Sequence, residues 1–200
     1  MAKNKPKAVI VHHSAISRFK NPDQFTAINN YHKRLWGNAV RSVLGFYGGY
    51  HYQISSNGIV RKYREEYEVG AHTKEKGMNY KSIGICLDGN FDIEEPSKEQ
   101  KKALLDLIGT LQVRHNIPDS NVEPHRNYAT YKTCWGKLLP SDILGCLEGA
   151  YDVKEYSWGE KYENDLMEKG FLIKRKPLHE PCTRAEVYKF ISLISDKYGK

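Results

Sequence analysis

The stretch Lys7-Ala-Val-Ile-Val-His12 sets the fold class, because β-branched residues in such a short apolar run predict a buried strand. A second run of this kind, Ser82-Ile-Gly-Ile-Cys-Leu87, predicts another buried strand. Between them, Asn57-Gly58 is a strong hairpin signal and joins two expected strands at 50–55 and 59–63.

Two helices are expected around these strands. The first begins at Asn21-Pro22 and runs up to Gly37. Its inward positions are Phe25, Ile28, Tyr31 or His32, and Leu35. The second opens at a capping box formed by Ser97 and Gln100 and ends before Pro118. The order strand, helix, hairpin, strand, helix predicts an α/β fold, a mixed central β-sheet flanked by helices. Residues 121–139 lack periodicity and predict a long loop.

The C-terminal part of the chain has a different sequence pattern, which predicts a small C-terminal helical module. Ser157 can cap a helix that Gly170 ends, and a capping box at Thr183-Arg-Ala-Glu186 opens another. We therefore expect two domains, residues 1–150 and residues 155–200. The alternative is that the second segment is a helical extension packed on the first domain.

The composition excludes several classes of protein. In a chain of 200 residues, 40% hydrophobic residues and charges of both signs favour a packed core over disorder. No apolar run approaches the ~18 residues of a membrane helix, so we expect no membrane insertion. No segment is typical of a signal peptide, so we expect synthesis in the cytoplasm. Four separated cysteines without a CxxC pair do not favour a disulfide framework.

The net charge of +7 lies mainly in the first 150 residues, since residues 151–200 hold ten basic and nine acidic side chains. A basic domain favours an anionic partner, either nucleic acid or a bacterial cell-wall polymer. No nucleic-acid-binding motif accompanies the charge, so we expect no nucleic-acid partner. The sequence leaves the oligomeric state open.

The positions of the histidine and cysteine residues indicate a candidate metal site. His12 lies at the end of a predicted strand, and His125 and Cys134 lie in the predicted loop. Three nitrogen and sulfur ligands leave one position of a tetrahedral zinc site open, which is the catalytic arrangement. The pattern alone also allows the alternative that the histidines are ordinary surface or core residues and that Cys134 is a small buried hydrophobic side chain.

Four blocks of sequence, in the same order along the chain, carry a family resemblance. They are Val9-Ile-Val-His-His-Ser-Ala15, Gly49-Tyr-His-Tyr52 with Asn57-Gly58, Val69-Gly-Ala-His72 with Asn79-Tyr-Lys-Ser-Ile-Gly-Ile85, and His125-Arg126 with Lys132-Thr-Cys134. Together they resemble the zinc-dependent N-acetylmuramoyl-L-alanine amidases of type 2. That family has the fold of T7 lysozyme and the peptidoglycan recognition proteins, which the resemblance implies for roughly two thirds of this chain.

The resemblance implies a zinc site and two catalytic side chains. His12, His125 and Cys134 match the positions that bind Zn²⁺ in the family. Tyr50 matches the tyrosine beside the catalytic water, and Lys132 matches the lysine that faces the scissile carbonyl. These residue types suit amide hydrolysis. A lysine charge stabilises an oxyanion, and a tyrosine hydroxyl can hold or relay the water proton because it both donates and accepts hydrogen bonds.

Three further positions are expected to contact substrate. They are His72, Asn79 and Arg126, although His72 could instead only pack. His13 falls where the family tolerates other residues, so we treat it as a neighbour of the site. Trp135 replaces the proline that usually follows the zinc cysteine, which leaves the path of this loop open.

The resemblance implies hydrolysis of the amide bond between N-acetylmuramic acid and L-alanine in peptidoglycan. Without a signal peptide, such an enzyme is expected to be a phage or prophage endolysin that reaches the wall through a membrane pore and lyses the cell. The alternatives are a host autolytic amidase and a non-catalytic peptidoglycan-binding protein. The last class usually lacks the zinc cysteine, which is present here as Cys134.

The segment 155–200 resembles an S-layer-homology-type repeat. The resemblance rests on Trp158, Gly170 and Thr183-Arg-Ala-Glu186. Such a module would bind a cell-wall polymer. The expected partners are therefore peptidoglycan and, as a further candidate, anionic cell-wall polymers.

Overall fold

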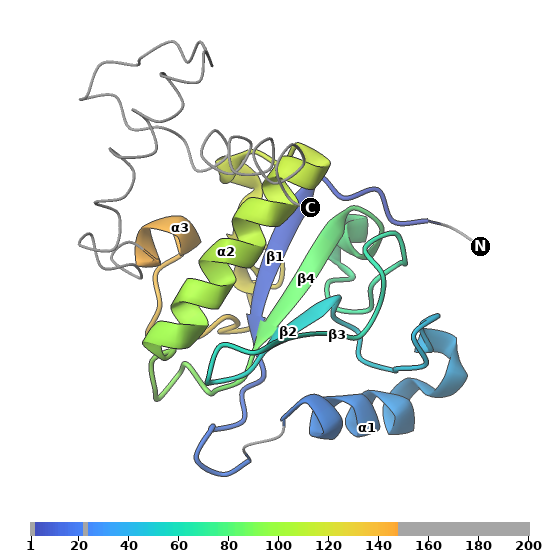
Figure 1. The fold of residues 1–200 in the computed structure, drawn as a ribbon, viewed down its shortest axis with the longest axis horizontal. Helices are drawn as coiled ribbons and strands as arrows, with labels where there is room; N and C mark the ends of the chain where they lie inside the picture. Colours follow the sequence, from blue (N-terminus) through green and yellow to red (C-terminus); the bar gives the residue numbers. More distant parts are fainter. Residues whose placement is uncertain (1–2, 22–23, 148–200) are drawn as a thin grey trace, which may run out of the picture. The chain divides into compact units, whose positions relative to one another are not determined.

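A computed structural model describes residues 3–21 and 24–147 and places a five-stranded β-sheet at the centre of this region (Figure 1). The strands lie in the order β3-β2-β4-β1-β5. Their bounds are β1 (Ala8–His13), β2 (Tyr52–Ile54), β3 (Val60–Lys62), β4 (Ser82–Leu87) and β5 (Val122–Pro124). β3 runs antiparallel to β2, and the other neighbouring pairs are parallel. The predicted mixed sheet is confirmed.

The two strands expected to be buried, β1 and β4, form the middle of the sheet. Every residue in both is buried, as is typical of parallel strands covered on both faces. Their register places His12 opposite Cys86. The β2–β3 hairpin is shorter than predicted, and Gly58 in its turn has a φ of +79°, which a glycine adopts without strain.

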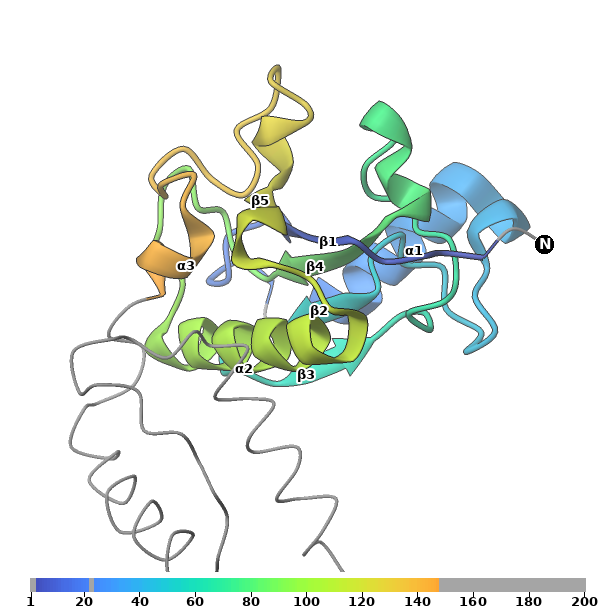
Figure 2. The ribbon, with the colours of Figure 1, turned by 90° about the horizontal axis from the view of Figure 1, so that it is seen from above.

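The helix α2 (Lys98–His115) lies along one face of the sheet, and the turns η2 (Glu75–Tyr80) and η4 (His125–Asn127) lie on the other side (Figure 2). The predicted capping box is present. Ser97 Oγ accepts a hydrogen bond from the Gln100 amide, and the Gln100 side chain accepts one from the Ser97 amide. The helix buries Leu104, Ile108 and Leu111 against the sheet.

The helix α1 (Gln24–Trp36) is followed by η1 (Gly37–Val40), so the predicted end at Gly37 is confirmed. Its expected start at Asn21-Pro22 overlaps residues 22–23, which lie outside the described part of the chain. Phe25, Ile28 and His32 are buried as predicted, whereas Leu35 is 53% exposed and does not contribute to the core.

The region 121–139 is not a continuous loop, which corrects the prediction. β5 pairs with β1 in parallel, and η4 follows it directly. A three-residue strand that contains a proline carries too little periodicity to be recognised in a sequence. The remaining elements are η3 (Asp119–Asn121) and α3 (Ile143–Cys146), which is capped by Asp142.

The buried carboxylate of Glu66, in the segment after β3, interacts with side chains at the end of α2. Glu66 accepts hydrogen bonds from Tyr52 Oη and from Arg114, and lies 2.5 Å from His115 Nε2. Burial alone would raise the pKa of Glu66, but the hydrogen bonds from Tyr52 and His115 and the charge of Arg114 outweigh it and lower the pKa. The ionised carboxylate therefore stabilises the fold.

The module expected at residues 155–200 lies outside the described residues, as do the helices expected within it. Within the described part of the chain, no helix combines the length and the apolar character that a membrane crossing requires.

Candidate metal centre

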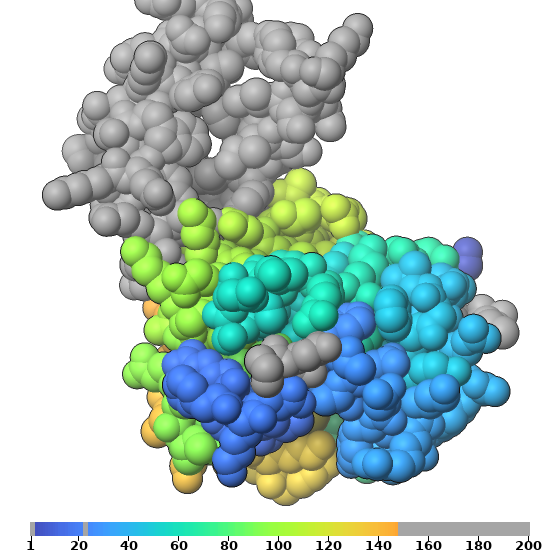
Figure 3. Space-filling view, turned by 60° about the horizontal axis from the view of Figure 1, so that its bottom comes forward, coloured from blue at the N-terminus to red at the C-terminus, as the bar shows by residue number. Residues whose placement is uncertain are grey.

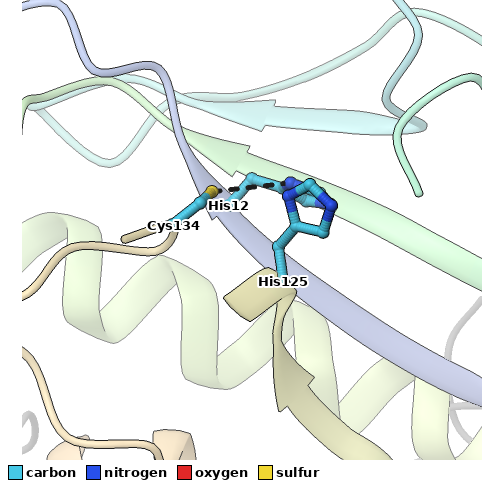
Figure 4. Close-up of side chains that lie close together, drawn as sticks. All are labelled: His12, His125 and Cys134. Atoms are coloured by element: carbon cyan, nitrogen blue, oxygen red, sulfur yellow. Dashed lines mark hydrogen bonds between the residues drawn. The ribbon is translucent and has the colours of Figure 1, made fainter. Parts of the chain in front are cut away.

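The three predicted zinc ligands lie together at the carboxyl end of the central strands. β5 runs parallel to β1 and pairs Pro124 with Val11, so the next residues along, His125 and His12, lie at the same level. The chain returns to this point at Cys134, whose Sγ lies 3.4 Å from the backbone nitrogen of His13. The donor atoms of His12, His125 and Cys134 lie within 4.8 Å of one another (Figure 4).

The spacing and chemistry of these donors fit zinc. Zinc–nitrogen bonds of about 2.05 Å and zinc–sulfur bonds of about 2.3 Å separate the two donors by about 3.6 Å around a tetrahedral ion. Cys134 Sγ lies 3.6 Å from His12 Nδ1. All three side chains are buried.

The protonation states of the histidines also suit a metal. Burial, followed by the charges of His125 and His72, holds the pKa of His12 well below its usual value. Burial and the charge of Lys132 lower the pKa of His125 to about 4. Both imidazoles are therefore neutral near pH 7 and have a free lone pair. Burial raises the pKa of the Cys134 thiol to about 12, so metal binding must displace its proton.

Tyr50 and Lys132 both lie near these ligands. The ring centroids of Tyr50 and His12 are 5.0 Å apart. Burial raises the pKa of Tyr50 well above its usual value, so its phenol keeps its proton. Lys132 is exposed on the loop before Cys134, and its positive charge lowers the pKa of both His12 and His125.

The three residues predicted to contact substrate make hydrogen bonds within the protein. His72 Nδ1 lies 3.1 Å from His12 Nε2. Asn79 Oδ1 accepts from the backbone nitrogens of His72 and Thr73. Arg126 donates to the carbonyls of Gly136 and Leu139 and so braces the loop that carries Cys134. Their contact with substrate stays a prediction.

Two residues near the site were not recognised from the sequence. Glu75 Oε2 lies 3.8 Å from His125 Nε2. His32 Nδ1 accepts a hydrogen bond from the Gly49 amide beside Tyr50. Glu75 carries no local sequence signal, and the helical spacing that predicts a buried His32 does not indicate its contact beside Tyr50, because both residues reach the site through tertiary packing. His13 is a neighbour, as expected: its Nδ1 accepts from the Phe91 amide, away from the three donors.

A pocket of about 310 Å³ adjoins the metal centre on the side of Tyr50. Its lining residues are Ser14, Ile16, Ala27, Ile28, Tyr31, His32 and Tyr50. They come from the segment after β1, from α1 and from the start of the hairpin. Segment 14–21 and α1 lie next to each other on one face of the molecule (Figure 3). Tyr50 lines this pocket and also neighbours His12, so it lies between the pocket and the metal centre.

Solved structures with the same fold place the chain in a structural class. LysC from Clostridium intestinale URNW has a TM-score of 0.56 at 27% identity and covers 72% of this chain and 86% of its own. The bumblebee protein PGRP-SA has a TM-score of 0.58 at 24% identity, over 72% of this chain and 84% of its own. The sheet with its flanking helices is thus the fold of the peptidoglycan recognition proteins.

Sequence comparison gives the family. The family model described as N-acetylmuramoyl-L-alanine amidase matches residues 2–137. The endolysin of Enterobacteria phage T3 is 31% identical over 127 residues, which are 61% of this chain and 70% of that protein. An N-acetylmuramoyl-L-alanine amidase of Sus scrofa is 34% identical over 80 residues, 39% of this chain and 13% of that protein. The chain belongs to the N-acetylmuramoyl-L-alanine amidase family.

Proposed function

We propose that this chain is a zinc-dependent amidase that cleaves the bond between N-acetylmuramic acid and L-alanine in bacterial peptidoglycan. The observation that carries the proposal is the convergence of His12, His125 and Cys134, with donor atoms within 4.8 Å, in a chain of this family. Two neutral imidazoles and one thiol leave one tetrahedral position open for chemistry.

The residues around this position have the properties that amide hydrolysis needs. When bound, zinc would lower the pKa of water towards 7 and polarise the scissile carbonyl. The Lys132 ammonium would stabilise the negative charge that develops on the carbonyl oxygen. The Tyr50 hydroxyl would accept a hydrogen bond from the attacking water and relay the proton that the water loses to the departing amine. The pocket between segment 14–21 and α1 would hold the part of the substrate next to this bond.

We further propose that the protein is a phage or prophage endolysin that reaches the wall through a membrane pore and lyses the cell. Support comes from the similarity to the phage T3 endolysin and from the basic charge of the first 150 residues, which favours anionic wall polymers. Residues 155–200 would add a wall-binding module. A host autolytic amidase is the alternative, and the complete donor set disfavours a non-catalytic peptidoglycan-binding protein.

Mass spectrometry of digested peptidoglycan tests the proposed reaction. The expected products are stem peptides with a free L-alanine amine and intact glycan strands. New reducing sugar ends, or cleavage within the stem peptide, would contradict it. A zinc-free preparation serves as the control for the metal requirement.

A further inference from the structure

The outer ring nitrogens of both histidine ligands face one short segment, residues 72–75. His12 Nδ1 lies on the side of Cys134, and its other nitrogen, Nε2, lies 3.1 Å from His72 Nδ1. One nitrogen of His125 lies on the side of His12 and Cys134, and the other points away (Figure 4). His125 Nε2 is buried, makes no hydrogen bond within the described residues, and has Glu75 Oε2 at 3.8 Å.

We propose that the segment His72–Glu75 positions the two histidine ligands for the metal. If His12 binds through Nδ1, its proton is on Nε2 and is donated to His72 Nδ1. If His125 binds through its inward nitrogen, its Nε2 carries the proton, and Glu75 is the acceptor. The present distance of 3.8 Å is about 1 Å longer than a charge-assisted hydrogen bond, so Glu75 would have to move closer by that amount to accept the proton. This inference rests on the proposed zinc site.

The segment is itself held rigidly. Asn79 Oδ1 accepts hydrogen bonds of 2.8 Å from the backbone nitrogens of His72 and Thr73. The His72 ring fills space left by two glycines, because a Cβ at Gly70 or Gly84 would come within 2.6 Å of it. Asn79 is therefore a positioning residue that acts through this segment.

The carboxylate of Glu75 is also oriented by a partner. Tyr131 Oη donates to Glu75 Oε1 at 2.9 Å, which leaves Oε2 directed at His125. Hydrogen-bond partners of this kind fix the tautomer and the orientation of a metal-bound imidazole, and their removal typically weakens metal binding about 10- to 100-fold.

The test is the zinc dissociation constant of the full chain, measured by competition with a chromophoric chelator. Glu75→Ala should weaken zinc binding about 10- to 100-fold, and Glu75→Gln, which keeps an acceptor, should recover part of the loss. The matched control is Glu123→Ala, since Glu123 lies two residues before His125 but bonds Asn127 and Tyr128 instead. The melting temperature of each zinc-free variant separates metal binding from stability.

A second pair of variants tests the His12 side. His72→Leu removes the acceptor and should weaken zinc binding, whereas His72→Asn places an oxygen near the position of Nδ1 and should restore it. Wild-type affinity in both Glu75→Ala and His72→Leu would overturn the inference and leave the zinc site standing. A wild-type chain that binds no zinc would overturn the proposed metal centre and this inference with it.

Discussion

Zinc binding to this chain should release one proton per ion near pH 6. Of the three proposed ligands, only the Cys134 thiol is protonated there, because burial raises its pKa to about 12. Burial lowers the pKa of His125 to about 4 and that of His12 well below its usual value, so both imidazoles are already neutral. Only deprotonated groups act as ligands, so loading the site must remove the thiol proton.

The number of protons released sets how steeply the zinc affinity depends on pH. One released proton makes the apparent zinc affinity rise tenfold for each pH unit, or about 1.4 kcal/mol. This slope should hold from about pH 5 to about pH 6.5, above the pKa of His125 and below the range in which the water of such a site ionises. Below about pH 4, protonation of His125 adds a second proton and steepens the slope.

Isothermal titration calorimetry in two buffers with different ionisation enthalpies counts the released protons directly. Competition with a chelator at several pH values gives the slope independently. An affinity that does not change with pH from about 5 to about 6.5 would refute the assignment of Cys134 as a buried, protonated ligand. A release of two protons in that range would refute the neutral state of the histidines.

Three further outcomes are expected. Lys132→Ala and Tyr50→Phe should keep zinc and lose about 10²- to 10³-fold in turnover on peptidoglycan, and normal turnover in both would contradict their catalytic roles. Glu66→Gln should lower the free energy of unfolding by about 1–3 kcal/mol at neutral pH. That loss should fade as the pH falls through the lowered pKa of Glu66, and urea unfolding that shows a pH-independent loss would contradict the account. Trp158→Ala should reduce sedimentation of the full chain with purified cell walls, and unchanged binding would count against a wall-binding role for residues 155–200.

The sequence predicted the part of the fold that depends on local pattern. The runs at Ala8–His13 and Ser82–Leu87 are strands, and the capping box at Ser97 opens α2. These elements carry strong signals because buried parallel strands are continuously apolar and a cap has a fixed spacing. The strand β5 has neither signal, and it was missed.

The candidate site was likewise predictable only in part, because local sequence places some of its residues and tertiary contacts place the others. The position of His12 at a strand end follows from its local sequence. The approach of His125 to His12 depends on the pairing of β5 with β1, and the return of the chain at Cys134 depends on a braced loop. Neither contact leaves a periodic pattern, so the prediction that these residues bind zinc came from the family resemblance. The segment 72–75 carries no local signal for its contacts with His12 and His125, because those contacts exist only in the folded chain.

The most direct test of the central claim is the release of free L-alanine amines from peptidoglycan by chain stripped of metal, before and after one equivalent of zinc is added. The account predicts no release from the stripped chain and full recovery at one equivalent. The same addition should not restore His12→Ala, His125→Ala or Cys134→Ala. Full release by the stripped chain, or recovery in the three variants, would contradict the claim that these residues hold the catalytic zinc.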